Sequence, residues 1–79
     1  MNGTLVFTIH AKNMMRERLI QEDWVESTVQ NPDMTELKRN DEKHYVKQIP
    51  QNQGKFLRVI VNPSVTPPRI ITVFFDRRV

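Results

Sequence analysis

The chain has 79 residues and a net charge of +3, which allows one domain spanning residues 1–79. It contains no cysteine, and this excludes disulfides, thiolate zinc sites and thiol catalysis. No apolar run approaches the about 20 residues that a membrane-spanning helix needs. We therefore expect a cytoplasmic protein that has no membrane partner.

The first predicted element is an amphipathic helix from about Thr8 or Ile9 to Arg18. Thr8 is suited to the N-cap because its hydroxyl can accept a backbone hydrogen bond. At 100° per residue one stripe of this helix contains Met14, Arg18, Ala11, Met15 and Leu19, with His10 at its edge. An arginine among apolar neighbours must reach solvent or find a partner.

The second predicted helix runs from about Glu22 to Gln30. The acidic pair Glu22-Asp23 suits the positive end of the helix dipole, and the inner stripe is Trp24, Val25, Thr28 and Val29. Asn31-Pro32 ends the helix because a residue before proline resists helical geometry. The short link between the helices predicts a tight corner or hairpin.

Four strands are predicted after the helices, and residues 1–7 are expected to form an extended lead-in arm. The strands are expected at residues 34–39, 44–49, 56–62 and 69–76. The last is the most apolar and is placed at the centre of the sheet. Short connections favour an antiparallel meander. The expected fold is α+β, in the order α-α-β-β-β-β, with two N-terminal helices packed on one face of a four-stranded, mainly antiparallel sheet.

Three side chains are candidates for chemistry, each with an ordinary structural alternative. His10 suits proton transfer near neutrality, or it bonds a nearby carbonyl. Arg18 suits a phosphate or a developing oxyanion, or it pairs with a carboxylate and the helix end. Thr72 could contact substrate, although strands favour threonine anyway. No glycine loop or metal-ligand spacing is present, so no cofactor and no metal are expected.

The positive charge is concentrated in the last third of the chain. Residues 1–54 hold seven Lys/Arg and eight Asp/Glu, whereas residues 55–79 hold five Lys/Arg and one acid. A basic segment is compatible with a phosphate-bearing partner, for which the candidate contacts are Arg58, Arg69, Arg77 and Arg78. The alternative is a solvated sheet edge, where basic residues discourage edge pairing.

A series of residues resembles domain-of-unknown-function family 4258, whose members typically read His-Ala-x-x-Arg-Met-x-x-Arg-Gly-Ile before an acidic helix ending in Asn-Pro. The matching residues are His10-Ala11, Met15, Arg18, Ile20, Glu22-Asp23, Val25 and Asn31-Pro32, with strands at Leu57–Val61 and Ile70–Phe74. Two positions depart from the family pattern. Met14 replaces an arginine, which removes one phosphate-binding candidate, and Leu19 replaces a glycine, which makes the helix corner less free to turn left-handed.

The family looks like a distant relative of the barnase, colicin and RelE-type ribonuclease toxins. That resemblance implies two helices on a four-stranded sheet and RNA cleavage without a metal. By analogy His10 would be the base or acid, Arg18 and Arg58 the phosphate clamp, and Thr72 a positioning hydroxyl. The implied partners are RNA and an antitoxin or another protein. The alternative function is a non-catalytic protein- or RNA-binding module on the same scaffold.

Overall fold

The computed structural model describes residues 5–79, apart from the side chain of Asn40. Two helices, α1 (Ile9–Arg18) and α2 (Glu22–Gln30), precede most of the sheet. The strands are β1 (Val6–Phe7), β2 (Met34–Leu37), β3 (Lys43–Ile49), β4 (Lys55–Asn62) and β5 (Arg69–Phe75). Single 3₁₀ turns at Arg39–Asp41 and Pro50–Asn52 join β2 to β3 and β3 to β4. Both predicted helices and all four predicted strands, which correspond to β2–β5, are confirmed within one or two residues.

The predicted four-stranded, mainly antiparallel sheet is wrong, because the sheet has five strands and is mixed. Its order is β1-β5-β4-β3-β2, and β1 runs parallel to β5 with Val6 opposite Arg69. The sequence placed Val6–Phe7 in a lead-in arm because two residues are too few to show a period of two. The middle strand is β4, and β5 lies between β4 and β1 rather than at the centre. The expectation for residues 1–4 lies outside the described residues.

Thr8 joins the start of α1 to the sheet. Its hydroxyl accepts a 3.1 Å hydrogen bond from the backbone N–H of Ala11, as predicted for the N-cap, and donates to the carbonyl of Ile71 at 3.0 Å. Its backbone N–H donates to the carbonyl of Ile70 at 3.1 Å. Two hydrogen bonds from Thr8 therefore fix the helix start to β5, and a third caps the helix itself.

Leu19 ends α1 in the left-handed conformation, with φ 56° and ψ 43°. The Ile20 N–H donates to the Met15 carbonyl at 2.8 Å, and the Leu19 N–H lies 3.4 Å from the Arg16 carbonyl. This is the Schellman arrangement, in which glycine usually takes the left-handed position. The predicted tight corner between the helices is confirmed. It forms although the left-handed conformation is sterically unfavourable for a leucine.

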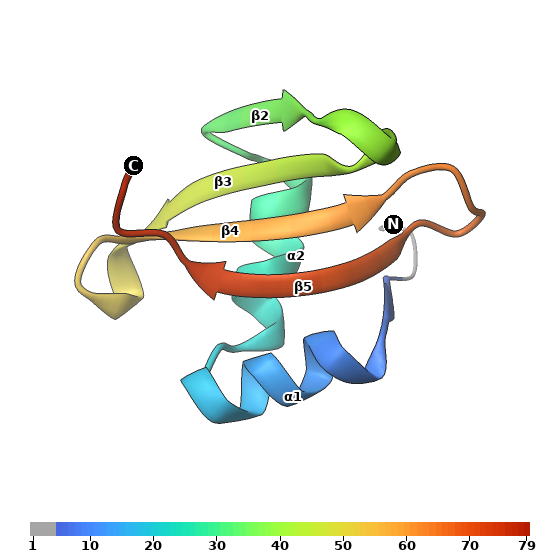
Figure 1. The fold of residues 1–79 in the computed structure, drawn as a ribbon. Helices are drawn as coiled ribbons and strands as arrows, with labels where there is room; N and C mark the ends of the chain where they lie inside the picture. The colour runs from blue at the N-terminus through green and yellow to red at the C-terminus, as the bar shows by residue number, and fades with distance from the viewer. Residues whose placement is uncertain (1–4) are drawn as a thin grey trace.

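The core lies between the helices and one face of the sheet. In Figure 1 the sheet stands in front of α2, and α1 lies beyond β5. Side chains of β4 and β5 alternate between the helix-covered face and the opposite, helix-free face. A bulge between Ile60 and Val61 brings Val61 opposite Ile70. The buried apolar residues of this core are Ala11, Ile20, Val25, Ile49, Leu57, Val59, Val61, Ile70 and Val73. Val46 is also fully buried, on the helix-free face. No helix within residues 5–79 is long and apolar enough to cross a membrane.

Candidate functional site

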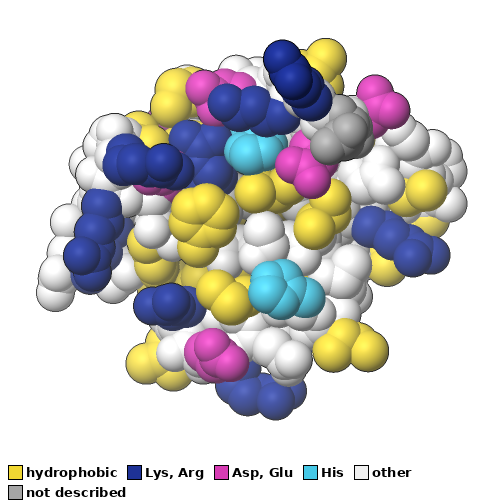
Figure 2. Space-filling model, viewed as in Figure 1, with side chains coloured by type: hydrophobic (Ala, Val, Ile, Leu, Met, Phe, Trp, Pro, Cys, Tyr) yellow, Lys and Arg dark blue, Asp and Glu magenta, His cyan; other side chains and the backbone are white. Residues whose placement is uncertain are grey.

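The helix-free face of the sheet carries most of the organised polar chemistry of the molecule. Strand register aligns two rows of side chains across β2, β3, β4 and β5 on this face. The first row is Glu36, His44, Ile60 and Thr72, and the second is Met34, Val46, Arg58 and Phe74. Figure 2 shows Lys/Arg, acidic and histidine side chains gathered over β2 and β3. Charged groups from distant parts of the chain thus meet on one surface.

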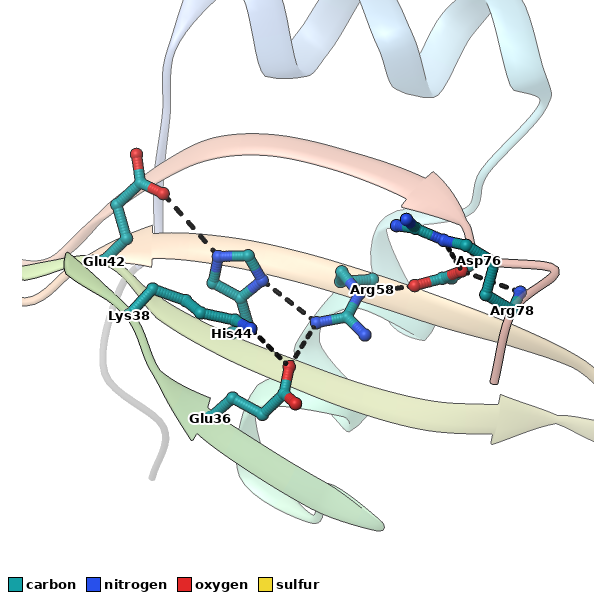
Figure 3. Close-up of polar contacts among 7 residues, drawn as sticks. All are labelled: Glu36, Lys38, Glu42, His44, Arg58, Asp76 and Arg78. Atoms are coloured by element: carbon teal, nitrogen blue, oxygen red, sulfur yellow. Dashed lines mark hydrogen bonds and ion pairs between the residues drawn. The ribbon is translucent and has the colours of Figure 1, made fainter.

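Arg58 is the centre of this polar cluster (Figure 3). Its Nε donates to Asp76 Oδ2 at 2.7 Å, and its Nη1 donates to Glu36 Oε1 at 2.8 Å. Nη1 also lies 3.0 Å from His44 Nδ1. The second terminal nitrogen, Nη2, has no hydrogen-bond partner within residues 5–79. The one N–H of Nε and the two of Nη1 are enough for the contacts with the protein. The two N–H groups of Nη2 therefore stay available to a ligand.

The carboxylates around Arg58 keep the cluster ionised although it is largely shielded from water. The Arg58 side chain is 11% exposed and that of Asp76 is 3% exposed. Burial opposes the charge on Arg58, but hydrogen bonds to Glu36 and Asp76 outweigh it and raise the pKa of the guanidinium. The backbone N–H of Arg78 and the side chain of Arg58 lower the pKa of Asp76. Such a charge without partners would be strongly unfavourable.

Glu36 belongs to the more open side of the cluster. The hydrogen bond from Arg58 is the main cause that lowers the pKa of Glu36, followed by the charge of Lys38. Lys38 Nζ lies 3.5 Å from the same Oε1 atom. The side chain of Glu36 is 39% exposed, so a carboxylate held by two cations faces solvent.

The contact with Arg58 fixes the hydrogen-bonding role of His44. A guanidinium can only donate, so Nδ1 of His44 must be the acceptor, and in the neutral ring the proton then lies on Nε2. Nε2 is buried and has no hydrogen-bond partner within residues 5–79. The nearest acid is Glu42, whose Oε1 lies 3.6 Å away. The imidazole therefore holds an N–H donor whose hydrogen bond is not made.

Two adjoining hollows open on this part of the surface. The ion-pair hollow has a volume of about 430 Å³ and is lined by Met34, Glu36, Lys38, His44, Arg58, Phe74, Asp76, Arg78 and Val79. The aromatic hollow has a volume of about 830 Å³ and is lined by Met14, Arg18, Leu19, Asn52, Lys55, Phe56, Phe74, Phe75, Asp76, Arg77 and Val79. The two hollows share Phe74, Asp76 and Val79, so a ligand of several units could occupy both.

The structure distributes the predicted site residues unevenly. Arg58 and Arg78 line the ion-pair hollow, and Arg18 and Arg77 line the aromatic hollow. Thr72 is half-buried in the row of His44, on the far side of Ile60. His10 is exposed in the first turn of α1, and Arg69 is exposed at the start of β5. Neither of these two residues lines either hollow.

The three residues that contact Arg58 directly were not predicted as site residues: Glu36, His44 and Asp76. Asp76 is the only acid in residues 55–79. Strand alternation puts it on the same face of the sheet as Arg58, so the sequence could have predicted that the two residues pair. Glu36 and His44 gave no such signal, because their approach to Arg58 depends on strand register. No group of three His, Asp or Glu side chains suited to a metal ion occurs in the described part of the chain.

Comparison with known proteins places the chain in a family. The model of a domain of unknown function (DUF4258) matches residues 7–75, which cover both helices and nearly the whole sheet. The chain belongs to this family. Neither the comparison with curated proteins nor that with solved structures gave a match for this DUF4258 domain. The ion-pair cluster of the domain lies inside the matched region up to Arg58, whereas Asp76 and Arg78 lie just beyond it.

Proposed function

We propose that this DUF4258 domain is an endoribonuclease that works without a metal ion, with its reaction centre in the ion-pair hollow. One observation carries the proposal: Arg58 lies within hydrogen-bond distance of a carboxylate and an imidazole on an open face. Cleavage of RNA through its own 2′-hydroxyl needs a base, an acid and a cation that stabilises the extra charge on phosphorus. A carboxylate base, an N–H donor for the leaving oxygen and a cation converge here, and water supplies the acid.

The roles follow from the hydrogen bonds already made. The solvent-facing carboxylate of Glu36 takes the proton of the 2′-hydroxyl, and the oxygen attacks the adjacent phosphorus. The bond from phosphorus to the 5′-oxygen breaks, and the leaving oxygen takes its proton from a water molecule. The Nε2–H of His44 donates a hydrogen bond to that oxygen after Glu42 turns aside, and the hydroxide that remains removes the proton from Glu36. Arg58, through Nη2, stabilises the charge that develops on the phosphoryl oxygens. The products are a 2′,3′-cyclic phosphate and a 5′-hydroxyl.

The residues expected from the sequence take supporting places in this proposal. Arg18 and Arg77 contact phosphates of the flanking RNA. Thr72 lies two strands from His44 with Ile60 between them and orients a more distant part of the RNA. His10 stays a separate candidate, because it is exposed on α1 outside both hollows. An antitoxin that covered the helix-free face would block the site.

The test is cleavage of a defined single-stranded RNA by purified protein in the presence of a chelator, with detection of cyclic phosphate ends. We expect Glu36→Gln to lower the rate by about 10²-fold or more, as for loss of a general base, and His44→Gln by about 10²-fold, as for loss of a donor directed at developing charge. Arg16→Ala, an exposed change on α1, is the matched control. Folding is checked by circular dichroism. Intact RNA with the wild-type protein would refute the proposal, and a loss caused by His10→Ala alone would move the reaction centre to α1.

A second candidate function is the non-catalytic binding module, and one observation favours it. Both carboxylates that contact Arg58 already neutralise it, which is the arrangement of a structural ion pair as well as of a reaction centre. In that case Glu36→Gln would change stability or partner binding, and no cyclic phosphate would form with any variant.

A further inference from the structure

The aromatic hollow combines positive charge with exposed ring surface. Arg18, Lys55 and Arg77 line it from α1, the start of β4 and the segment after β5. None of the three forms an ion pair with another residue of the described range 5–79. Asp76 is the only Asp or Glu within residues 5–79 that lines the hollow, and its carboxylate already accepts hydrogen bonds from Arg58 and Arg78. The hollow therefore presents unneutralised cations to solvent.

Phenylalanine rings form the apolar part of the same hollow. Phe75 belongs to the core edge, since its ring meets Trp24 edge to face at 6.2 Å between centroids. Phe56 and Phe74 are half-buried and line the hollow without such a partner ring within residues 5–79. A ligand with a flat, apolar face and a negative charge would use both features, and a nucleotide has this combination.

We propose that the aromatic hollow binds one nucleotide of a single-stranded RNA, with its base against Phe56 or Phe74 and its phosphates at Arg18, Lys55 and Arg77. Stacking on a side chain requires an unpaired base, so duplex RNA would bind less well. An uncharged apolar ligand would leave three cations unpaired, and a free phosphate would leave the rings uncovered. The choice of RNA rests on the function proposed above.

The position of the hollow gives the nucleotide a defined place relative to the reaction centre. Phe74, Asp76 and Val79 border both hollows, so the bound nucleotide is next to the phosphodiester held at Arg58. The buried carboxylate of Asp76 lies between them and holds Arg58 on one side and the backbone of Arg78 on the other. The aromatic hollow is thus a neighbouring subsite that strengthens binding of RNA longer than a dinucleotide.

The experiment measures binding of a 2′-O-methyl hexanucleotide, which cannot be cleaved through its 2′-oxygen, by fluorescence anisotropy at low salt. We expect Phe74→Leu, Phe56→Leu and Arg18→Ala each to raise the Kd about fivefold or more, the lower end of the contribution of one base stack. Arg16→Ala is the matched control for Arg18→Ala, because both arginines are exposed in the last turn of α1 and only Arg18 lines the hollow. A duplex of the same sequence should bind more weakly.

Several outcomes would overturn this subsite. One is an unchanged Kd in folded Phe56→Leu and Phe74→Leu variants. Another is equal binding of heparin or an acidic peptide and of the hexanucleotide, which would show a general polyanion or protein surface. A third is displacement of the hexanucleotide by inorganic phosphate at the same concentration at which a mononucleotide displaces it, which would show that the hollow binds simple anions.

The two proposals can fail separately. Binding with the expected variant pattern but without cleavage of ordinary RNA would remove the ribonuclease and keep the subsite. Cleavage with a KM that Arg18→Ala leaves unchanged for long RNA would remove the subsite and keep the ribonuclease.

Discussion

Arg58 and Asp76 form an ion pair, 2.7 Å from Nε to Oδ2, that ties the middle strand of the sheet to the segment after the last strand. Asp76 is 5% exposed as a residue, and the same carboxylate accepts the backbone N–H of Arg78 at 2.9 Å. One buried acid therefore holds both the cation of the proposed reaction centre and the chain that borders both hollows.

Asp76→Asn should lower the free energy of unfolding by about 2 kcal/mol at neutral pH, because a hydrogen-bonded charge pair is lost while the shape is kept. Urea denaturation measures the change. The control is Arg78→Ala, since the Arg78 side chain is 86% exposed and its removal should change the free energy by at most about 0.5 kcal/mol. Equal effects of the two changes would show that the buried pair does not stabilise the fold.

Stability should fall in acid because of Asp76 and Glu36. Their pKa values in the folded protein are lowered from the ordinary values of 3.8 and 4.5. The unfolded chain then binds more protons in this range, so the contribution is complete above about pH 5 and is lost as the pH falls through the lowered values. The measurement is the urea midpoint between pH 7 and pH 3. The Asp76→Asn variant should lose less stability over this range than the wild type, and parallel curves would contradict the assignment.

Leu19→Gly should raise the free energy of unfolding by about 0.5–1 kcal/mol. Leu19 has a φ of 56°, a conformation that costs a residue with a side chain roughly 1–2 kcal/mol. Glycine removes this cost, but the greater entropy of its unfolded chain cancels part of the gain in stability. The side chain is 78% exposed, so little packing is lost. Leu19→Ala keeps the Cβ atom and should give no such gain. If both variants gained equally, relief of the backbone would not be the cause.

Leu57→Ala should cost about 3 kcal/mol, since the side chain is fully buried between the helices and β4 and its loss leaves a cavity. In a domain of this size that is a large part of a total of about 4–12 kcal/mol. Leu37→Ala is the matched control, because Leu37 is 76% exposed on β2. Its midpoint of thermal unfolding should stay within about 3 °C of the wild type. A similar loss in both variants would show that the core has been placed incorrectly.

Local patterns in the sequence predicted the helices, four of the strands and the N-cap at Thr8, because each depends on neighbouring residues. The strand β1 escaped prediction because two residues carry no periodicity, and its partner Arg69 lies at the other end of the chain. The cluster around Arg58 escaped for a related reason. Its partners are 14, 18 and 22 residues away along the chain, and only the register of the strands brings them together.

The hydrogen bond from Thr8 to Ile71 spans 63 residues, and it has a consequence for the order of folding. Within this domain α1 is synthesised before β5, the last strand, on which it packs. Closing so long a loop is slow and entropically costly. We therefore expect the helix to dock only after β5 has left the ribosome, so that the domain folds as one late, cooperative unit rather than from its N-terminus onward.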